Sequence, residues 1–135
     1  MTTHKINFID NPAAKSGFVA ITIDCAKVLK SWKESVYSYE WLDQSGAIKP
    51  KAALKPAEQD KRNNAEQAIA LNKPIPKPIL GIGVMDNIEI GTGRAELLTL
   101  IDQGHTTLPV HVPKGQEKDF TPFLAKPKHA SNSTT

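Results

Sequence analysis

The sequence predicts a small α/β or α+β domain in which a mixed sheet is covered by helices. Short apolar runs rich in β-branched residues are typical of buried strands. They alternate with segments whose apolar residues recur every three or four positions, which is helical spacing. This alternation favours a sheet covered by the helices expected at 25–43 and 94–103. The length of 135 residues suits one hydrophobic core of ordinary size, so we expect a single domain over 1–125.

The composition is that of an ordinary folded protein with a mild positive charge. Hydrophobic residues make up 39% and charged residues 23% of the chain, so we expect disorder only at the ends, chiefly in the tail KPKHASNSTT at 126–135. Lys and Arg number 17 against 14 Asp and Glu, a net charge of +3, which is low for a dedicated nucleic-acid coat. The single cysteine and the lack of a signal peptide or a long apolar run predict a cytoplasmic protein without a membrane span.

The first long strand and the first helix are expected to follow each other without a loop. Residues 18–24, FVAITID, are typical of a buried strand, and Asp24 can cap a helix that starts at Cys25. We expect this helix to reach about Asp43, with a break near Ser38. Its apolar stripe consists of Val28, Leu29, Trp32, Val36 and Tyr39.

A second helix is expected in the proline-flanked segment that follows. Pro56 suits a first helical position, and Asn72 with Pro74 marks the exit. The apolar face is mostly alanine, so this helix is predicted to pack lightly. It should carry Lys61 and Arg62 to solvent and could face a partner.

The second half of the chain is predicted to form a hairpin, a helix and a last strand. Two apolar runs within 77–90 are joined at Asp86 and Asn87, residue types that tolerate the positive φ angles of a tight turn. A helix should occupy 94–103 and a strand 108–112. The core face of that strand is expected to hold Leu108, Val110 and Val112.

A glycine turn and an arginine stand at the start of the helix expected at 94–103. The first amides of a helix lack internal partners and attract anions. Gly91 and Gly93 let the backbone approach a ligand, and Thr92 offers a hydroxyl. Arg94 adds a planar guanidinium that matches phosphate oxygens. These four residues predict a phosphate-binding site, although they match neither the P-loop nor the dinucleotide fingerprint.

Three carboxylates near this turn are candidates for catalysis or metal binding. If a phosphate ester is hydrolysed, Arg94 would neutralise developing charge while a carboxylate orients water or a metal ion. Glu89 and Glu96 are the candidate catalytic carboxylates, and Asp86 is the candidate ligand for a divalent metal such as Mg²⁺. The alternative is that the glycines only turn the chain and that Arg94 pairs with Glu89, Asp86 or a carboxylate elsewhere. In that reading Glu96 only interacts with the helix dipole.

Other residues are weighed between a site and a structural role. His111 could line the site, although a lone strand histidine is usually a surface residue or a satisfied one. Trp32 is expected in the core, and Trp41 with Tyr37 could stack on a base, but packing is the better prediction. Basic residues in 49–62 and near the end of the chain could follow a phosphate backbone if they converge.

The run IEIGTGRAELLTLIDQGHTTLPVHV resembles the signature box of the ParB and sulfiredoxin superfamily. That box has a strand, a G-x-x-R sequence opening a helix, a glycine and an IPV-type strand. The corresponding residues here are Gly91, Thr92, Gly93, Arg94, Gly104, Leu108, Pro109 and Val110. The similarity covers about 57–112, and LGIGVMDNIEIGTGR resembles the single-domain plasmid fertility-inhibition proteins of that superfamily, which suppress conjugative transfer.

The resemblance implies a small domain that binds DNA or a nucleotide such as ATP, and that combines nucleotide hydrolysis with DNA cleavage. Sulfiredoxins have a cysteine where Thr92 and Gly93 stand, which excludes their thiol chemistry. ParB clamps have a further arginine, a second nucleotide box and a DNA-reading domain that this chain lacks, which puts a partition function in doubt. We therefore expect a phosphate-binding protein with ATPase or DNase activity that inhibits conjugative plasmid DNA transfer. The alternatives are a DNA-binding regulator without hydrolysis and an inhibitor that binds a protein of a transfer or defence complex.

Overall fold

The computed structural model describes residues 6–126 and is built around a four-stranded sheet. In spatial order its strands are β2 (Phe18–Asp24), β6 (Thr107–Pro113), β4 (Ile79–Ile82) and β5 (Ile88–Thr92). Strands β2 and β6 are antiparallel, as are β4 and β5, whereas β4 and β6 are parallel. The sheet is therefore mixed, as predicted, and β5 forms one of its edges.

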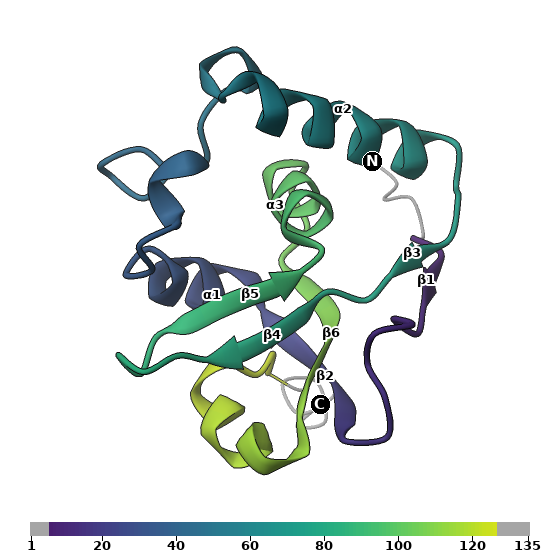
Figure 1. Ribbon diagram of the computed structural model, residues 1–135, viewed down its shortest axis with the longest axis vertical. Coiled ribbons are helices and arrows are strands. Elements are labelled where there is room, and N and C mark those ends of the chain that lie inside the picture. The colour runs from purple at the N-terminus through teal and green to yellow at the C-terminus, as the bar shows by residue number, and fades with distance from the viewer. Residues whose placement is uncertain (1–5, 127–135) are drawn as a thin grey trace, which may run out of the picture.

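The helices lie in layers on this sheet (Figure 1). Helix α1 (Cys25–Trp32) follows β2 directly, with Asp24 as its N-cap, and α3 (Arg94–Asp102) follows β5. Helix α2 (Pro56–Ala70) packs on α3, which occupies the layer between α2 and the sheet. Within residues 6–126, no helix is both long enough and apolar enough to cross a membrane.

Several short elements were not expected from the sequence. Strand β1 (Phe8–Ile9) pairs in parallel with β3 (Ile75–Pro76), and three short 3-10 helices are present, namely η1 (Ser38–Glu40), η2 (Lys51–Ala53) and η3 (Lys114–Phe123). Strands β1 and β3 and helices η1 and η2 span two or three residues each, too few to produce a hydrophobic period, whereas η3 spans ten residues and was missed. Apart from Lys126, the tail predicted to be disordered lies outside the described residues.

Helix α1 ends at Trp32, so the prediction that it reaches about Asp43 was wrong. The hydroxyl of Ser38 donates to the carbonyl oxygens of Lys33 at 2.8 Å and Ser35 at 2.9 Å. Local bonds of this kind satisfy backbone groups outside a helix and so compete with helix continuation. As a result Val36 and Tyr39, which were expected on the buried stripe, are 75% and 56% exposed.

The apolar residues of the remaining elements meet in one core as predicted. Leu108, Val110 and Val112 of β6 are at most 2% exposed, and the β4–β5 hairpin turns at Asp86 with a φ angle of +64°. Trp32 and Trp41 are both buried, which confirms that Trp41 packs instead of offering a free ring to a base.

Helix α2 is attached to α3 by an ion pair more than by apolar contacts. The prediction that Arg62 faces solvent was wrong, because this residue is 7% exposed. Its Nη2 atom donates to Asp102 of α3 at 2.9 Å and its Nε atom to Glu66 at 2.8 Å. Ala65 is the one apolar residue of α2 that is fully buried; the partly buried Ile69 and the bond from Trp41 Nε1 to Glu58 add further contacts.

Replacing Arg62 should therefore loosen α2. We expect Arg62→Ala to lower the free energy of unfolding by about 2 to 3 kcal/mol. This is less than breaking a fully buried pair costs, because Glu66 and Asp102 are 29% and 40% exposed. Chemical denaturation measures the change, with the exposed cation Lys73 as control, for which Lys73→Ala should change stability by less than about 0.5 kcal/mol. Equal stability of the two variants would contradict the attachment of α2 through Arg62.

Candidate functional site

The glycine turn between β5 and α3 depends on the backbone of Gly93. Its φ angle of +81° lies in the left-handed region that side chains disfavour. A Cβ atom at this position would lie 3.0 Å from the Cα atom of Pro78, so the turn packs tightly on the segment that leads into β4. No side chain caps the N-terminus of α3, which leaves its first amides without a side-chain partner.

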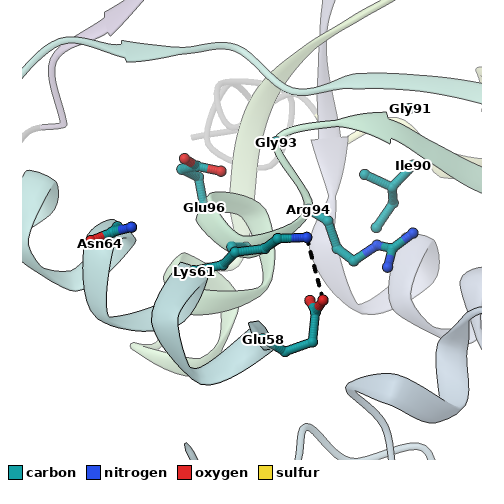
Figure 2. A pocket seen from close by; sticks show the side chains of 9 residues that line it. Glu58, Lys61, Asn64, Ile90, Gly91, Gly93, Arg94 and Glu96 are labelled. Atoms are coloured by element: carbon teal, nitrogen blue, oxygen red, sulfur yellow. Dashed lines mark hydrogen bonds and ion pairs between the residues drawn. The ribbon is translucent and has the colours of Figure 1, made fainter. Parts of the chain in front are cut away.

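A cleft of about 410 Å³ lies between this turn and α2. In Figure 2, Lys61 reaches across it from α2, with Glu96 on one side and the Arg94 guanidinium on the other. Of the predicted site residues, the cleft is lined by Gly91, Gly93, Arg94 and Glu96, and α2 adds Glu58, Lys61 and Asn64. The structure therefore brings most of the predicted phosphate-binding residues to one hollow, whose second wall is α2.

Arg94 lines the cleft but is already held by the protein. Its Nη1 atom donates to Glu40 at 3.0 Å, and its side chain is 26% exposed. The guanidinium carbon lies 5.6 Å from the ring centroids of both Trp32 and Tyr37, which places the cation beside two aromatic rings. The structure thus confirms the alternative in which Arg94 pairs with a carboxylate. The partner is Glu40, and not Glu89 or Asp86.

Lys61 is the cation with more freedom in this cleft. Its ammonium group lies 3.3 Å from Glu58 and its side chain is 62% exposed, whereas Glu58 is 9% exposed and also accepts a 2.8 Å bond from Trp41 Nε1. Burial acts to raise the pKa of Glu58, but the bonds from Trp41 and Lys61 outweigh it and hold that pKa below its usual value. Glu58 therefore keeps its charge without depending on Lys61 alone.

The three predicted carboxylates lie in different places. Glu96 lines the cleft, whereas Glu89 does not: it accepts bonds from Ser35 at 2.6 Å and Asn87 at 2.9 Å. Asp86, the predicted metal ligand, is exposed in the hairpin turn between β4 and β5 and also lies outside the cleft lining. Glu96 is thus the predicted carboxylate that shares the cleft with Arg94.

Thr92 faces a second, smaller hollow of about 180 Å³. Its hydroxyl accepts a 3.0 Å bond from the Asn11 side chain, which also donates to the carbonyl oxygen of Lys77 at 2.9 Å. Gly93 and Glu96 line both hollows, so the turn separates them. Thr92 therefore lines the hollow beside Asn11 and not the cleft that contains Lys61.

His111 and Cys25 take no part in the cleft. Both ring nitrogens of His111 are buried without a hydrogen bond among the described residues, and Nε2 lies 3.6 Å from Asp10. The residue is therefore buried without a hydrogen bond, unlike the surface or satisfied residue that a lone strand histidine usually is. Burial, followed by the charge of Asp24, raises the pKa of the Cys25 thiol to about 12, which agrees with the exclusion of thiol chemistry.

The positive and negative charges around the cleft are balanced, which affects whether the cleft can bind a metal ion. Glu58 and Glu96 face Lys61 and Arg94, so the lining carries two charges of each sign. Across residues 6–126, no three His, Cys, Asp or Glu side chains gather closely enough to hold a metal ion. Mg²⁺ commonly uses one or two carboxylates together with the phosphates of its ligand. Glu96 and Glu58 could therefore hold such an ion only together with a bound phosphate.

A scan against models of known protein families, a search of curated proteins and a search of solved structures each found no match. Function is therefore inferred from the residues of the cleft.

Two glycine variants test the constraint at the turn. Gly93 and Gly104 both have positive φ angles, +81° and +104°, but a Cβ atom at Gly104 would meet nothing within 4 Å. Gly104→Ala should cost about 1 to 2 kcal/mol of stability from backbone strain alone. Gly93→Ala should cost at least about 1 kcal/mol more, because its Cβ atom also meets Pro78. Chemical denaturation of both variants measures the difference, and an equal loss would show that contact with Pro78 does not constrain the turn.

Proposed function

We propose that the cleft binds the phosphate group of a nucleotide or of a nucleic acid, and that the protein slowly hydrolyses a phosphate ester there. One observation carries the proposal: the uncapped N-terminus of α3, the left-handed turn at Gly93 and the exposed ammonium of Lys61 border the same hollow. Backbone amides at a helix N-terminus and a lysine are a common pair of phosphate ligands.

Lys61 is the group that can change partner when a phosphate enters. Its 3.3 Å contact with Glu58 is long for a charge-assisted hydrogen bond, and the Lys61 end of the pair is 62% exposed, so the ammonium can leave Glu58 without losing its contact with solvent. When Lys61 turns to a phosphate, Glu58 loses one partner but keeps the hydrogen bond from Trp41. The interaction that Glu58 loses is therefore weaker than the one that Lys61 gains. A phosphate group between Lys61 and the amides of α3 would then be neutralised from both walls of the cleft.

Arg94 would act from a fixed position. Only its Nη1 atom is engaged by Glu40, and the rings of Trp32 and Tyr37 restrict its movement. A cation held in advance stabilises charge that develops in a transition state without first having to reorient. Glu96, at the first turn of α3, is the carboxylate in place to orient a water molecule or, with the phosphate, a divalent ion such as Mg²⁺.

The proposal extends to the biological class that the sequence motif suggests. We propose a cytoplasmic plasmid protein related to the ParB and sulfiredoxin superfamily that inhibits conjugative DNA transfer through ATPase or DNase activity. A binding protein without hydrolysis is the second candidate, because Arg94 already neutralises Glu40. Contact with a protein of the transfer machinery is favoured by the hairpin tip, where Val84 and Met85 are 100% and 79% exposed.

Phosphate binding is tested by calorimetric titration with inorganic pyrophosphate. We expect Lys61→Ala to weaken binding about tenfold or more, because a hydrogen bond to a charged group contributes about 1.5 to 3 kcal/mol. Lys73→Ala removes the same charge from an exposed position outside the cleft lining and should change the affinity little. If both variants bind pyrophosphate as the unmodified protein does, the cleft is not the binding site.

Hydrolysis is tested with ATP and single-stranded DNA in the presence of Mg²⁺. Arg94→Ala should lower turnover by about 100-fold or more if its charge stabilises the transition state. Glu40→Gln is the matched control, since it removes the charge that Arg94 pairs with and leaves the guanidinium in place. Circular dichroism checks that both variants fold. Unchanged turnover in Arg94→Ala would remove this residue from the mechanism, and an equal loss in both variants would show that only the ion pair matters.

A further inference from the structure

Two tyrosines stand exposed on the segment that links α1 to α2. Tyr37 and Tyr39 are the only tyrosines of the chain, and they are 54% and 56% exposed. Tyr37 directly precedes the short helix η1 and Tyr39 lies within it, in the region where α1 was expected to continue. Two exposed rings this close in the sequence can form a binding surface, because aromatic side chains contribute large contact areas.

Each of these rings has a cation beside it. The Arg94 guanidinium carbon lies 5.6 Å from the centroid of Tyr37, and the Lys55 ammonium lies 5.2 Å from the centroid of Tyr39. The Lys49 ammonium donates to the carbonyl oxygen of Tyr39 at 2.7 Å, so a third cation is held at the same place. We call Tyr37, Tyr39 and these three cations the tyrosine surface.

We propose that the tyrosine surface binds single-stranded nucleic acid by stacking bases on the two rings while the cations contact the phosphates. A single strand offers both groups that this surface matches, flat bases and a negative backbone. A duplex keeps its bases stacked inside and could reach only the cations. The ligand class is shared with the proposed function, but apart from Arg94 the residues are separate from those of the cleft.

Among the described residues, Glu40 is the carboxylate paired with cations of the tyrosine surface, and three cations against one carboxylate leave that surface a net charge of +2. Glu40 is engaged by Arg94 at 3.0 Å and by Lys55 at 4.0 Å. Asp43 accepts the Ser45 hydroxyl and the backbone N–H groups of Ser45 and Ala47, so its oxygens are occupied within the loop. The centre of a protein–protein interface usually has few charged residues. The three cations of the tyrosine surface therefore favour a nucleic acid over a protein as its ligand.

Binding is measured by fluorescence anisotropy with a labelled oligothymidine of about ten nucleotides and with the corresponding duplex, at about 50 mM and about 200 mM salt. We expect the single strand to bind more tightly, and Tyr37→Leu and Tyr39→Leu each to weaken it about tenfold. Tyr37→Phe and Tyr39→Phe keep the rings and should stay within about twofold of the unmodified protein. Thermal unfolding checks that each variant folds.

Photocrosslinking to a bromouracil-substituted strand tests the unmodified protein directly and does not depend on the variants folding. Trypsin should release the two tyrosines together in the peptide 34–51, because a proline follows Lys49. Crosslinks in this peptide are expected. The proposal is overturned if the leucine variants bind as the unmodified protein does, if the duplex binds equally well, or if the strand does not bind at about 50 mM salt. That last result would leave the surface to a protein partner.

The two proposals can fail separately. If pyrophosphate does not bind while the strand binds through the tyrosines, only the cleft proposal fails. If pyrophosphate binding depends on Lys61 while the leucine variants bind the strand normally, only the tyrosine surface fails.

Discussion

The position of α2 is the constraint on which the site depends, and the guanidinium of Arg62 is the main contact that holds this helix on α3. Arg62 joins Glu66 of its own helix to Asp102 of α3, and it does so at 7% exposure. A helix with an alanine-rich face has too little apolar area to dock by the hydrophobic effect alone. Without α2 in this position the glycine turn would lack the second wall of the cleft. In this position, α2 supplies Lys61, Glu58 and Asn64 as a second wall, and the turn becomes one side of a cleft.

The pairing of Arg94 with Glu40 changes how the turn can act. A free arginine at a helix N-terminus would add its full charge to that of the helix dipole. Here the charge is shared with a carboxylate from a segment more than fifty positions earlier in the chain, and two aromatic rings fix its direction. Arg94 is therefore better suited to orienting a ligand than to attracting it, and the attraction falls to Lys61 and the backbone amides. The same contact connects the cleft with the exposed tyrosines.

Short sequence patterns predicted those parts of the structure that depend on residues close together in the chain. The hairpin at Asp86, the turn at Gly93 and the start of α2 at Pro56 each follow from the conformational preference of one residue, and all were predicted. The early end of α1 was missed because apolar spacing continues through Val36 and Tyr39, while the Ser38 hydroxyl that bonds to the backbone beyond the helix leaves no period in the sequence.

The composition of the site could be predicted only in part, for a similar reason. Gly91, Gly93, Arg94 and Glu96 are close in sequence, so their meeting at the cleft follows from the turn and the first turn of α3. Glu40 and Glu58 come from remote segments, and their side chains reach Arg94 and Lys61 only because the layers stack as they do. Neither the ion pair of Arg94 nor the burial of Arg62 can be read from charge patterns, since the same residues would serve equally well on a solvated surface.

The Asn11 amide has a consequence for the order in which the molecule assembles. It connects the Lys77 carbonyl and the Thr92 hydroxyl, which lie 66 and 81 positions further along the chain. Closing so long a loop is entropically costly, so contacts of this kind tend to form late in folding. The short β1–β3 pair beside Asn11 adds few further bonds. The contacts of Asn11 with Lys77 and Thr92 are therefore expected to form after the hairpin and the β5–α3 turn, which need only local chain closure.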